Sequence, residues 1–294
     1  MDVRSKLLVS TDWLAQKLKE EDESVVLLHC SQEEDRRDYK WERIPESVCF
    51  DLRVCRDNDS PYRNTLPSAQ FFADYVTRLG VSNSDRVVVY DVYDPPNTTT
   101  ACRVWNMFRI FGHDNCSVLN GGLMQWIKEG RPTAGSKKLG KAPFVAGFRP
   151  ELLVDYDTVL SNVKANNAVP MVDTRMAPVF RGEHYYLGIV QGHIRGTVNV
   201  PNEEHLCEDE EKRFLFKSNE QLKKLYQRKG LDLDQPLISS CGTGMTANST
   251  IFAAALMGID TVPLYDGSYY EFVHRAHGRF LETSNGLQQQ KQQP

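Results

Sequence analysis

A cysteine at the start of a glycine-containing loop is the strongest chemical signal in the sequence. Cys241 follows a short apolar run and precedes a helix-like run of small and apolar residues at 253–256. The pattern predicts a strand, a loop and a helix. In such a unit the loop amides and the helix N-terminus favour a thiolate over a thiol. The sequence therefore predicts a nucleophile at Cys241, surrounded by the substrate-binding loop residues Gly242, Thr243, Gly244, Met245 and Thr246.

A cysteine-dependent phosphatase shares this arrangement but closes its loop with an arginine. Here the loop is followed by Ala247 and Asn248. Without an arginine, the charge that develops on a transferring phosphoryl group has no bidentate partner. The sequence therefore argues against a phosphatase.

An internal repeat positions this loop within the chain. Adding 150 to a residue number pairs similar residues, and after a four-residue slip the shift becomes 146. The first shift pairs Ile44 with Ile194, Val48 with Val198, Ser68 with Ser218 and Gly80 with Gly230; the second pairs Ala101 with Ala247, Gly112 with Gly258, Gly121 with Gly267 and Trp126 with Phe272. A duplicated domain with one altered turn is expected to give this pattern.

Each half alternates short apolar runs with helical patterns, which predicts an α/β fold of two tandem domains, each a parallel sheet flanked by helices on both faces. Strands are expected at 25–28, 87–90, 117–119, 169–172, 237–240 and 261–264, and helices at 68–79 and 101–111. The expected divisions are a non-catalytic domain at 1–135, a linker at 136–152, a catalytic domain at 153–287 and a disordered tail at 288–294.

The slip between the halves falls on the loop that carries the nucleophile. In the first half an aspartate, Asp91, occupies the position equivalent to Cys241, and its loop is four residues longer with prolines at 95 and 96. Proline has no N–H, so this loop is not expected to form the same ring of amides. One half is predicted to be catalytic and the other structural.

Composition restricts the classes of partner. The 294 residues are 40% hydrophobic and 25% charged with a formal net charge of −4, which argues against a nucleic-acid partner. Seven cysteines lack CxxC spacing, and their odd number argues against a disulfide framework or a zinc site. A reducing compartment fits best, and neither a secretion signal nor a membrane span is expected.

Several motifs together resemble the two-domain rhodanese and 3-mercaptopyruvate sulfurtransferase family. They are the tandem arrangement, the helix at 103–109, Leu119-Asn120-Gly121-Gly122-Leu123, Gly192-His193-Ile194, the loop at 241–247 and Tyr265-Asp266-Gly267-Ser268. The resemblance implies a cofactor-free, ping-pong sulfur transfer through a persulfide on the cysteine, from a small-molecule donor to cyanide, a small thiol or a thioredoxin-like dithiol. It leaves cytoplasm and mitochondrion both open, and we expect the cytoplasm.

The loop and its surroundings bear on the sulfur donor. Gly242-Thr243-Gly244 is similar to the family's mercaptopyruvate pattern and carries no lysine or arginine, which disfavours dianionic thiosulfate. Arg181 matches one of two family arginines that bind the substrate, whereas the second aligns with Tyr186. An aspartate and a histidine of the family's proposed proton relay align with Arg53 and Asn64. Arg53 is a hypothetical replacement for the missing positive charge.

These departures leave a second hypothesis open, in which the protein is a persulfide carrier without turnover or a regulatory binding module. Other polar residues have structural interpretations. We expect a structural histidine at His193 and a helix cap at Thr246. Asp173 and Arg175 follow a strand at the carboxyl edge where α/β sites form, and a buried ion pair between them explains their presence equally well.

Overall fold

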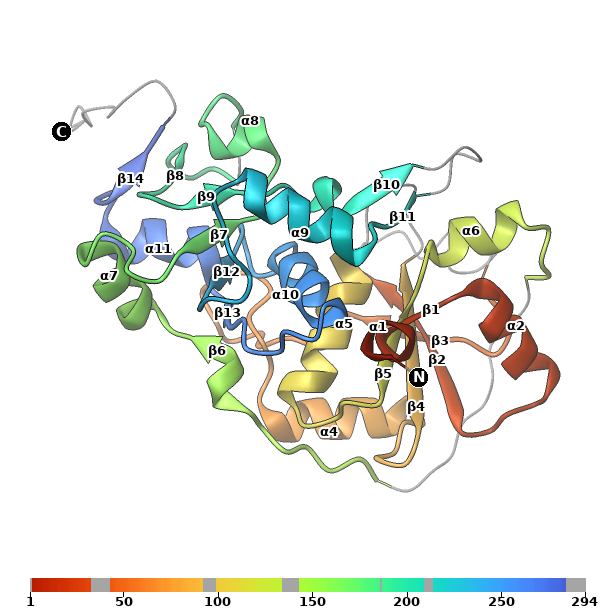
Figure 1. Cartoon of the computed structure of the whole chain (residues 1–294). Helices are drawn as coiled ribbons and strands as arrows, with labels where there is room; N and C mark the ends of the chain where they lie inside the picture. The colour runs from red at the N-terminus through yellow and green to blue at the C-terminus, as the bar shows by residue number, and fades with distance from the viewer. Residues whose placement is uncertain are drawn as a thin grey trace.

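Two five-stranded parallel sheets of the same strand order form the framework of the protein (Figure 1). The computed structural model describes residues 2–32, 43–91, 99–133, 143–185, 187–208 and 214–283. The first sheet has the order β1-β5-β4-β2-β3 and the second the order β6-β13-β12-β7-β9. Position by position, the second sheet repeats the first, so the predicted α/β class and tandem repeat are confirmed.

The first domain alternates strands and helices as expected. In chain order its elements are α1 (Val3–Leu7), β1 (Leu8–Val9), α2 (Thr11–Lys19), β2 (Val25–Ser31), β3 (Val48–Asp51), α4 (Ala69–Arg78), β4 (Arg86–Asp91), α5 (Thr99–Ile110), β5 (Cys116–Leu119) and α6 (Gly122–Lys128).

The second domain follows the same plan with additional short strands. Its elements are η1 (Pro150–Leu152), β6 (Leu153–Val154), α7 (Tyr156–Lys164), β7 (Met171–Asp173), α8 (Ala177–Phe180), β8 (His193–Ile194), β9 (Val198–Asn199), η2 (Asn202–His205), β10 (Leu206–Glu208), β11 (Phe214–Phe216), α9 (Asn219–Arg228), β12 (Ile238–Ser240), α10 (Ala247–Leu256), β13 (Leu264–Tyr265), α11 (Ser268–Ala276) and β14 (Leu281–Glu282). The antiparallel pairs β10–β11 and β8–β14 were not expected from the sequence.

Matching caps begin and end the equivalent helices α4 and α9. Ser68 Oγ accepts a hydrogen bond from the third residue of α4, and Ser218 forms a capping box at the start of α9. Gly80 and Gly230 follow the two helices with φ of 79° and 75°, a backbone conformation that glycine adopts without strain. The helix expected at 68–79 is confirmed, and α9 begins and ends in the same way.

Helices α5 and α10 pack against each other where the two domains meet (Figure 1). Every residue of both helices is buried, as expected of helices inside a core. The rings of Trp105 and Phe252 meet edge to face with centroids 4.8 Å apart. Buried apolar residues from both domains form one continuous cluster around this pair.

The segment before the second domain packs on the first. Gly147 N donates to Phe111 O at 2.9 Å, and Phe144 is 4% exposed within the first-domain core. Part of the predicted linker 136–152 is therefore a packed segment, whereas residues 134–142 and the predicted tail lie outside the described residues. The domain boundaries themselves stay predictions.

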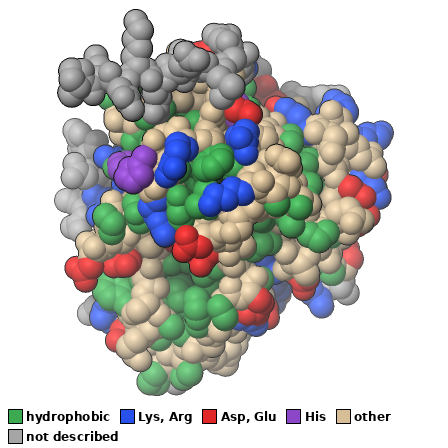
Figure 2. Space-filling view, turned by 90° about the vertical axis from the view of Figure 1, so that its left-hand side faces the viewer, with side chains coloured by type: hydrophobic (Ala, Val, Ile, Leu, Met, Phe, Trp, Pro, Cys, Tyr) green, Lys and Arg blue, Asp and Glu red, His purple; other side chains and the backbone are tan. Residues whose placement is uncertain are grey.

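The molecular surface mixes charge types. The face turned toward β14 and α7 in Figure 1 carries acidic, basic and apolar side chains beside one another (Figure 2). Among the described helices, none combines the length and the apolar character needed to cross a bilayer.

Candidate active site

Cys241 lies where the sequence predicts it, between β12 and α10. Strand β12 ends at Ser240, whose register partner is Asp173 at the end of β7, and α10 begins at Ala247. The cysteine thus lies at the carboxyl edge of a parallel sheet, where α/β proteins bind their ligands. Its side chain is 1% exposed, so the thiol is enclosed by protein.

The first two carbonyls of the loop are held by helix α11. Tyr269 N donates to Cys241 O at 3.0 Å, and Tyr270 N donates to Gly242 O at 2.9 Å. A trans peptide directs its C=O and the following N–H to opposite sides, so the amides of Gly242 and Thr243 point away from α11. Within the described part of the chain neither amide has an acceptor.

Ser268 ties the loop to the start of α11 through one oxygen atom. Its Oγ accepts hydrogen bonds from Cys241 N at 3.1 Å and from Gly244 N at 3.2 Å, and lies 3.8 Å from Cys241 Sγ. The hydroxyl donates to Tyr265 O at 2.7 Å. The amide of Gly244 is therefore engaged by a side chain, which differs from the expectation that it faces the sulfur.

The role of Ser268 was missed by sequence reasoning. The residue is fully buried with φ of 51°, in the left-handed region that is strained for a serine. Its first-domain counterpart under the 146 shift is Gly122, with φ of 55°. A Cβ on Gly122 would lie 2.7 Å from Asp91 O. The sequence signal that could have identified Ser268 is a serine at a repeated turn where the first domain has a glycine.

A loop of the first domain reaches across to the catalytic loop. Asn64 Nδ2 donates to Thr243 Oγ1 at 2.9 Å. Arg53 instead forms an ion pair with Asp51, with Nη2 and Oδ2 2.9 Å apart. Of the two first-domain positions singled out from the sequence, Asn64 contacts the loop, and Arg53 is bound within its own domain.

Asp91 occupies the corresponding place in the first domain. Its Oδ1 accepts hydrogen bonds from Ala101 N at 3.0 Å and from Thr100 Oγ1, at the start of α5. Burial raises the pKa of the Asp91 carboxyl to about 8, because a carboxylate is poorly solvated there. Residues 92–98 of the longer loop lie outside the described residues, so the predicted loss of the amide ring stays a prediction.

A family model described as Rhodanese-like domain matches residues 10–129 and again residues 155–275. The chain belongs to the rhodanese-like domain family. Each matched range contains four of the five strands of one parallel sheet, which agrees with the repeat.

Relatives similar over most of the chain include two kinds of rhodanese-family enzyme. Thiosulfate sulfurtransferase of Rattus norvegicus is 41% identical over 92% of this chain and 93% of its own length. The 3-mercaptopyruvate sulfurtransferase of Homo sapiens is 37% identical over the same shares. Among solved structures, the 3-mercaptopyruvate sulfotransferase SseA of Escherichia coli superposes with a TM-score of 0.79 at 32% identity, covering 90% of this chain and 99% of that one.

Arg181, predicted from the sequence to match a substrate-binding arginine, follows α8 and is half-exposed. Its guanidinium forms two hydrogen bonds of 2.7 Å to the carboxylate of Glu183. Within the described chain no hydrogen bond or ion pair joins Arg181 to the loop at 241–247. Tyr186 lies outside the described residues.

Two further polar groups near the site have structural roles in this rhodanese fold. Arg175 and Asp173 form a buried ion pair with a shortest N–O distance of 2.6 Å. His193 stacks on Phe180 with centroids 3.7 Å apart, and its Nδ1 lies 2.9 Å from Phe180 O. The first observation agrees with the ion-pair alternative for Asp173 and Arg175, and the second agrees with the structural interpretation of His193.

Thr246 does not cap α10 as expected. It stands at the N-cap position with helical backbone angles and makes no side-chain cap hydrogen bond. Its Oγ1 instead accepts a hydrogen bond of 2.7 Å from Thr174 Oγ1, which follows β7. A capping residue normally has extended backbone angles, and the turn of the catalytic loop removes that conformation here.

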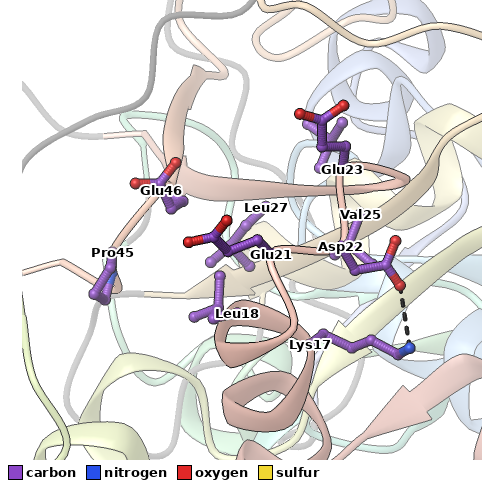
Figure 3. Close-up of a pocket in the computed structure, with 10 residues that line it drawn as sticks. Lys17, Leu18, Glu21, Asp22, Glu23, Val25, Leu27, Pro45 and Glu46 are labelled. Atoms are coloured by element: carbon purple, nitrogen blue, oxygen red, sulfur yellow. Dashed lines mark ion pairs between the residues drawn. The ribbon is translucent and has the colours of Figure 1, made fainter.

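A cavity of about 410 Å³ lies beside α2 (Figure 3). Its acidic lining residues include Glu21, Asp22, Glu23 and Glu46, and Lys17 pairs with Asp22 at 3.1 Å. It opens where β2 begins, at the amino edge of the first sheet, and its described lining residues include no cysteine.

Proposed function

We propose that this rhodanese-family sulfurtransferase carries a sulfane sulfur as a persulfide on Cys241. The proposal rests chiefly on one observation: a buried thiol begins a loop whose amides at Gly242 and Thr243 have no acceptor in the described chain. Free amides at the N-terminus of a helix stabilise a sulfur anion. The same amides stabilise the outer sulfur of a persulfide.

The proposed transfer has two half-reactions. The Cys241 thiolate attacks the sulfur of the donor, an S–S bond forms, and the bond from that sulfur to the donor breaks. With 3-mercaptopyruvate, the C–S electron pair leaves as the enolate of pyruvate, which takes a proton. An acceptor thiolate then attacks the outer sulfur, and Cys241 leaves as the thiolate. A ping-pong rate law is expected.

A mercapto-acid is our favoured donor. The loop residues 242–244 offer no cation to a dianion, whereas Arg181 offers a guanidinium to a single carboxylate. That guanidinium is now paired with Glu183, and both side chains are about 40% exposed. An exposed ion pair contributes only about 0–1 kcal/mol, so a donor carboxylate can replace Glu183.

Intact-mass measurement after separate incubation with 3-mercaptopyruvate and with thiosulfate tests the proposal. We expect a gain of one sulfur atom from the mercapto-acid, lost again on adding a small thiol. Cys241→Ser is expected to gain none, and Cys207→Ser, which removes a partly exposed thiol, is expected to gain as much as the wild type. Sulfur transfer by Cys241→Ser at the wild-type rate would overturn the assignment.

A persulfide carrier without turnover is the second candidate, and one contact favours it. The side chain that reaches Thr243 is the amide of Asn64, which cannot take up or release a proton at neutral pH. A carrier forms one persulfide per chain and then stalls, whereas an enzyme releases many equivalents of pyruvate.

We place the protein in the cytoplasm with a small thiol or thioredoxin-like acceptor, and cell fractionation tests the location.

A further inference from the structure

Two buried side chains of α5, in the first domain, reach across the interface to the catalytic loop. Arg103 is 2% exposed, and its Nη1 donates to Gly244 O at 3.0 Å and to Asp266 Oδ1 at 2.7 Å. Asn106 is 1% exposed, and its Nδ2 donates to Asn248 Oδ1 at 2.9 Å. Neither residue was singled out as a site residue from the sequence.

These contacts converge on two loop carbonyls. Asn248 Nδ2, held from behind by Asn106, donates to Gly244 O at 2.8 Å and to Met245 O at 2.7 Å. Gly244 O therefore accepts from both Arg103 and Asn248, so its direction is fixed from two sides.

The direction of a carbonyl determines the direction of the next amide. A planar trans peptide points its C=O and the following N–H to opposite sides. With the carbonyls of Gly244 and Met245 turned toward α5, the amides of Met245 and Thr246 point away from the interface. Both amides lack an acceptor in the described chain. They join the free amides of Gly242 and Thr243 as donors that a sulfur anion can use.

The same guanidinium also anchors the first-domain loop that contacts Thr243. Arg103 Nη2 donates to Asn64 O at 2.7 Å, and Leu66 N donates to Asp266 Oδ2 at 2.8 Å. A planar guanidinium can reach several acceptors in fixed directions, which a lysine ammonium on a flexible stem cannot reproduce. Arg103 thus links α5, the loop at 64–66 and the catalytic loop in one buried network.

We propose that Arg103 and Asn106 are positioning residues for Cys241, so that the catalytic loop of the second domain acquires its amide ring only when packed against α5 of the first. Neither residue touches the sulfur; both act by turning loop carbonyls away from it. The proposal rests on the proposed function of Cys241 and assigns to the first domain a part in that function.

The test compares two buried arginines of the same helix. Arg109 also crosses the interface, where its Nη2 donates to Asp260 O beyond the far end of α10. The measured quantity is the rate at which iodoacetamide alkylates Cys241 in the folded protein, determined by peptide mass mapping. Arg103→Met is expected to lower this rate at least tenfold. Arg103→Lys is expected to be intermediate, and Arg109→Met to stay within twofold of the wild type while losing a similar amount of thermal stability.

Steady-state kinetics provide the second measurement. Since Arg103 is buried behind the loop, its loss is expected to lower kcat at least tenfold and to change KM for the donor less than twofold. If Arg103→Met does not fold, Asn106→Ala takes its place, with an expected decrease in alkylation rate of threefold or more.

Folded variants at both positions with wild-type alkylation rates would overturn the positioning role. Alkylation does not require sulfur transfer. A wild-type protein that takes no sulfur from any donor would therefore contradict the proposed function and leave this test intact.

Discussion

The hydroxyl oxygen of Ser268 accepts hydrogen bonds from two amides of the loop that begins at Cys241, those of Cys241 and Gly244. Without it, the buried amides of Cys241 and Gly244 lose their acceptor, and an unsatisfied buried amide costs about 1–3 kcal/mol. We expect Ser268→Ala to lower kcat/KM about tenfold or more and to lower the melting temperature. Steady-state assays and thermal melts measure the two effects.

Ser268→Gly is the matched variant for this prediction. It removes the same hydroxyl and also the Cβ, which at φ of 51° carries strain of about 1–2 kcal/mol. The glycine variant is expected to be as inactive as the alanine variant but more stable. Wild-type activity in either variant would show that the hydroxyl does not order the loop.

Asp91 makes the stability of the first domain depend on pH. Its pKa is raised from an ordinary value of 3.8 to about 8, so the unfolded chain loses this proton at lower pH than the folded protein. The contribution of Asp91 to stability is fully present below pH 4 and is lost as the pH rises through 8. Asp91 therefore destabilises the folded protein at neutral and higher pH, where the unfolded chain is ionised at this residue.

Asp91→Asn is expected to remove this penalty. The amide oxygen still accepts from Ala101 N, and no charge is buried. We expect a gain in the free energy of unfolding on the order of 2–4 kcal/mol near pH 8 and little gain near pH 4. Urea titrations across this range measure the difference. An equal gain at both pH values would contradict the prediction.

Elements with local sequence signals were predictable. The helix expected at 68–79 is observed as Ala69–Arg78, because Ser68 and Gly80 supply a cap and a stop at its two ends. The strand, loop and helix around Cys241 also follow from local pattern. Strands β6 and β10, of two and three residues, were not predicted. Each is positioned by the neighbouring strand that pairs with it, β13 for β6 and β11 for β10.

The candidate site divides in the same way. Cys241 and its loop are contiguous in the chain, so the sequence alone located them. Ser268 and Arg103 act through contacts with residues 27 and 141 positions away, and no local pattern specifies such a contact. Thr246 was assigned by local pattern to a cap that the tertiary contact with Thr174 prevents.

The segment after the first domain's last helix is an element of its core and not a free linker. Phe144 packs edge to face on Phe72 with centroids 5.9 Å apart and also contacts Phe108. We expect Phe144→Ala to cost about 3–5 kcal/mol of unfolding free energy. Val145→Ala, at a 71% exposed neighbour, should cost less than about 0.5 kcal/mol. Denaturant titration compares them, and similar small effects would mean that the segment is only loosely attached.

At the scale of the whole molecule, the two domains share one interface core and one polar network. The cluster around α5 and α10 contains residues of both domains, and Arg103 connects loops of the two domains. A catalytic loop fixed by contacts from the partner domain gives a physical reason for retaining a repeat whose own nucleophile position holds Asp91. It also implies that the domains do not unfold independently.

Tryptophan fluorescence can test this coupling in a Trp105→Phe background, which removes the indole that meets Phe252 of α10. The three remaining tryptophans precede residue 127 and so report on the first domain. Val159 is fully buried in a cluster made only of second-domain residues. If unfolding is one cooperative transition, Val159→Ala lowers stability by about 1–3 kcal/mol and shifts the fluorescence midpoint in urea by the corresponding amount. Hydrogen exchange of second-domain peptides should give the same midpoint. A fluorescence midpoint that stays at the wild-type value while the exchange midpoint falls would mean that the domains unfold separately, and that the interface network does not join them into one unit.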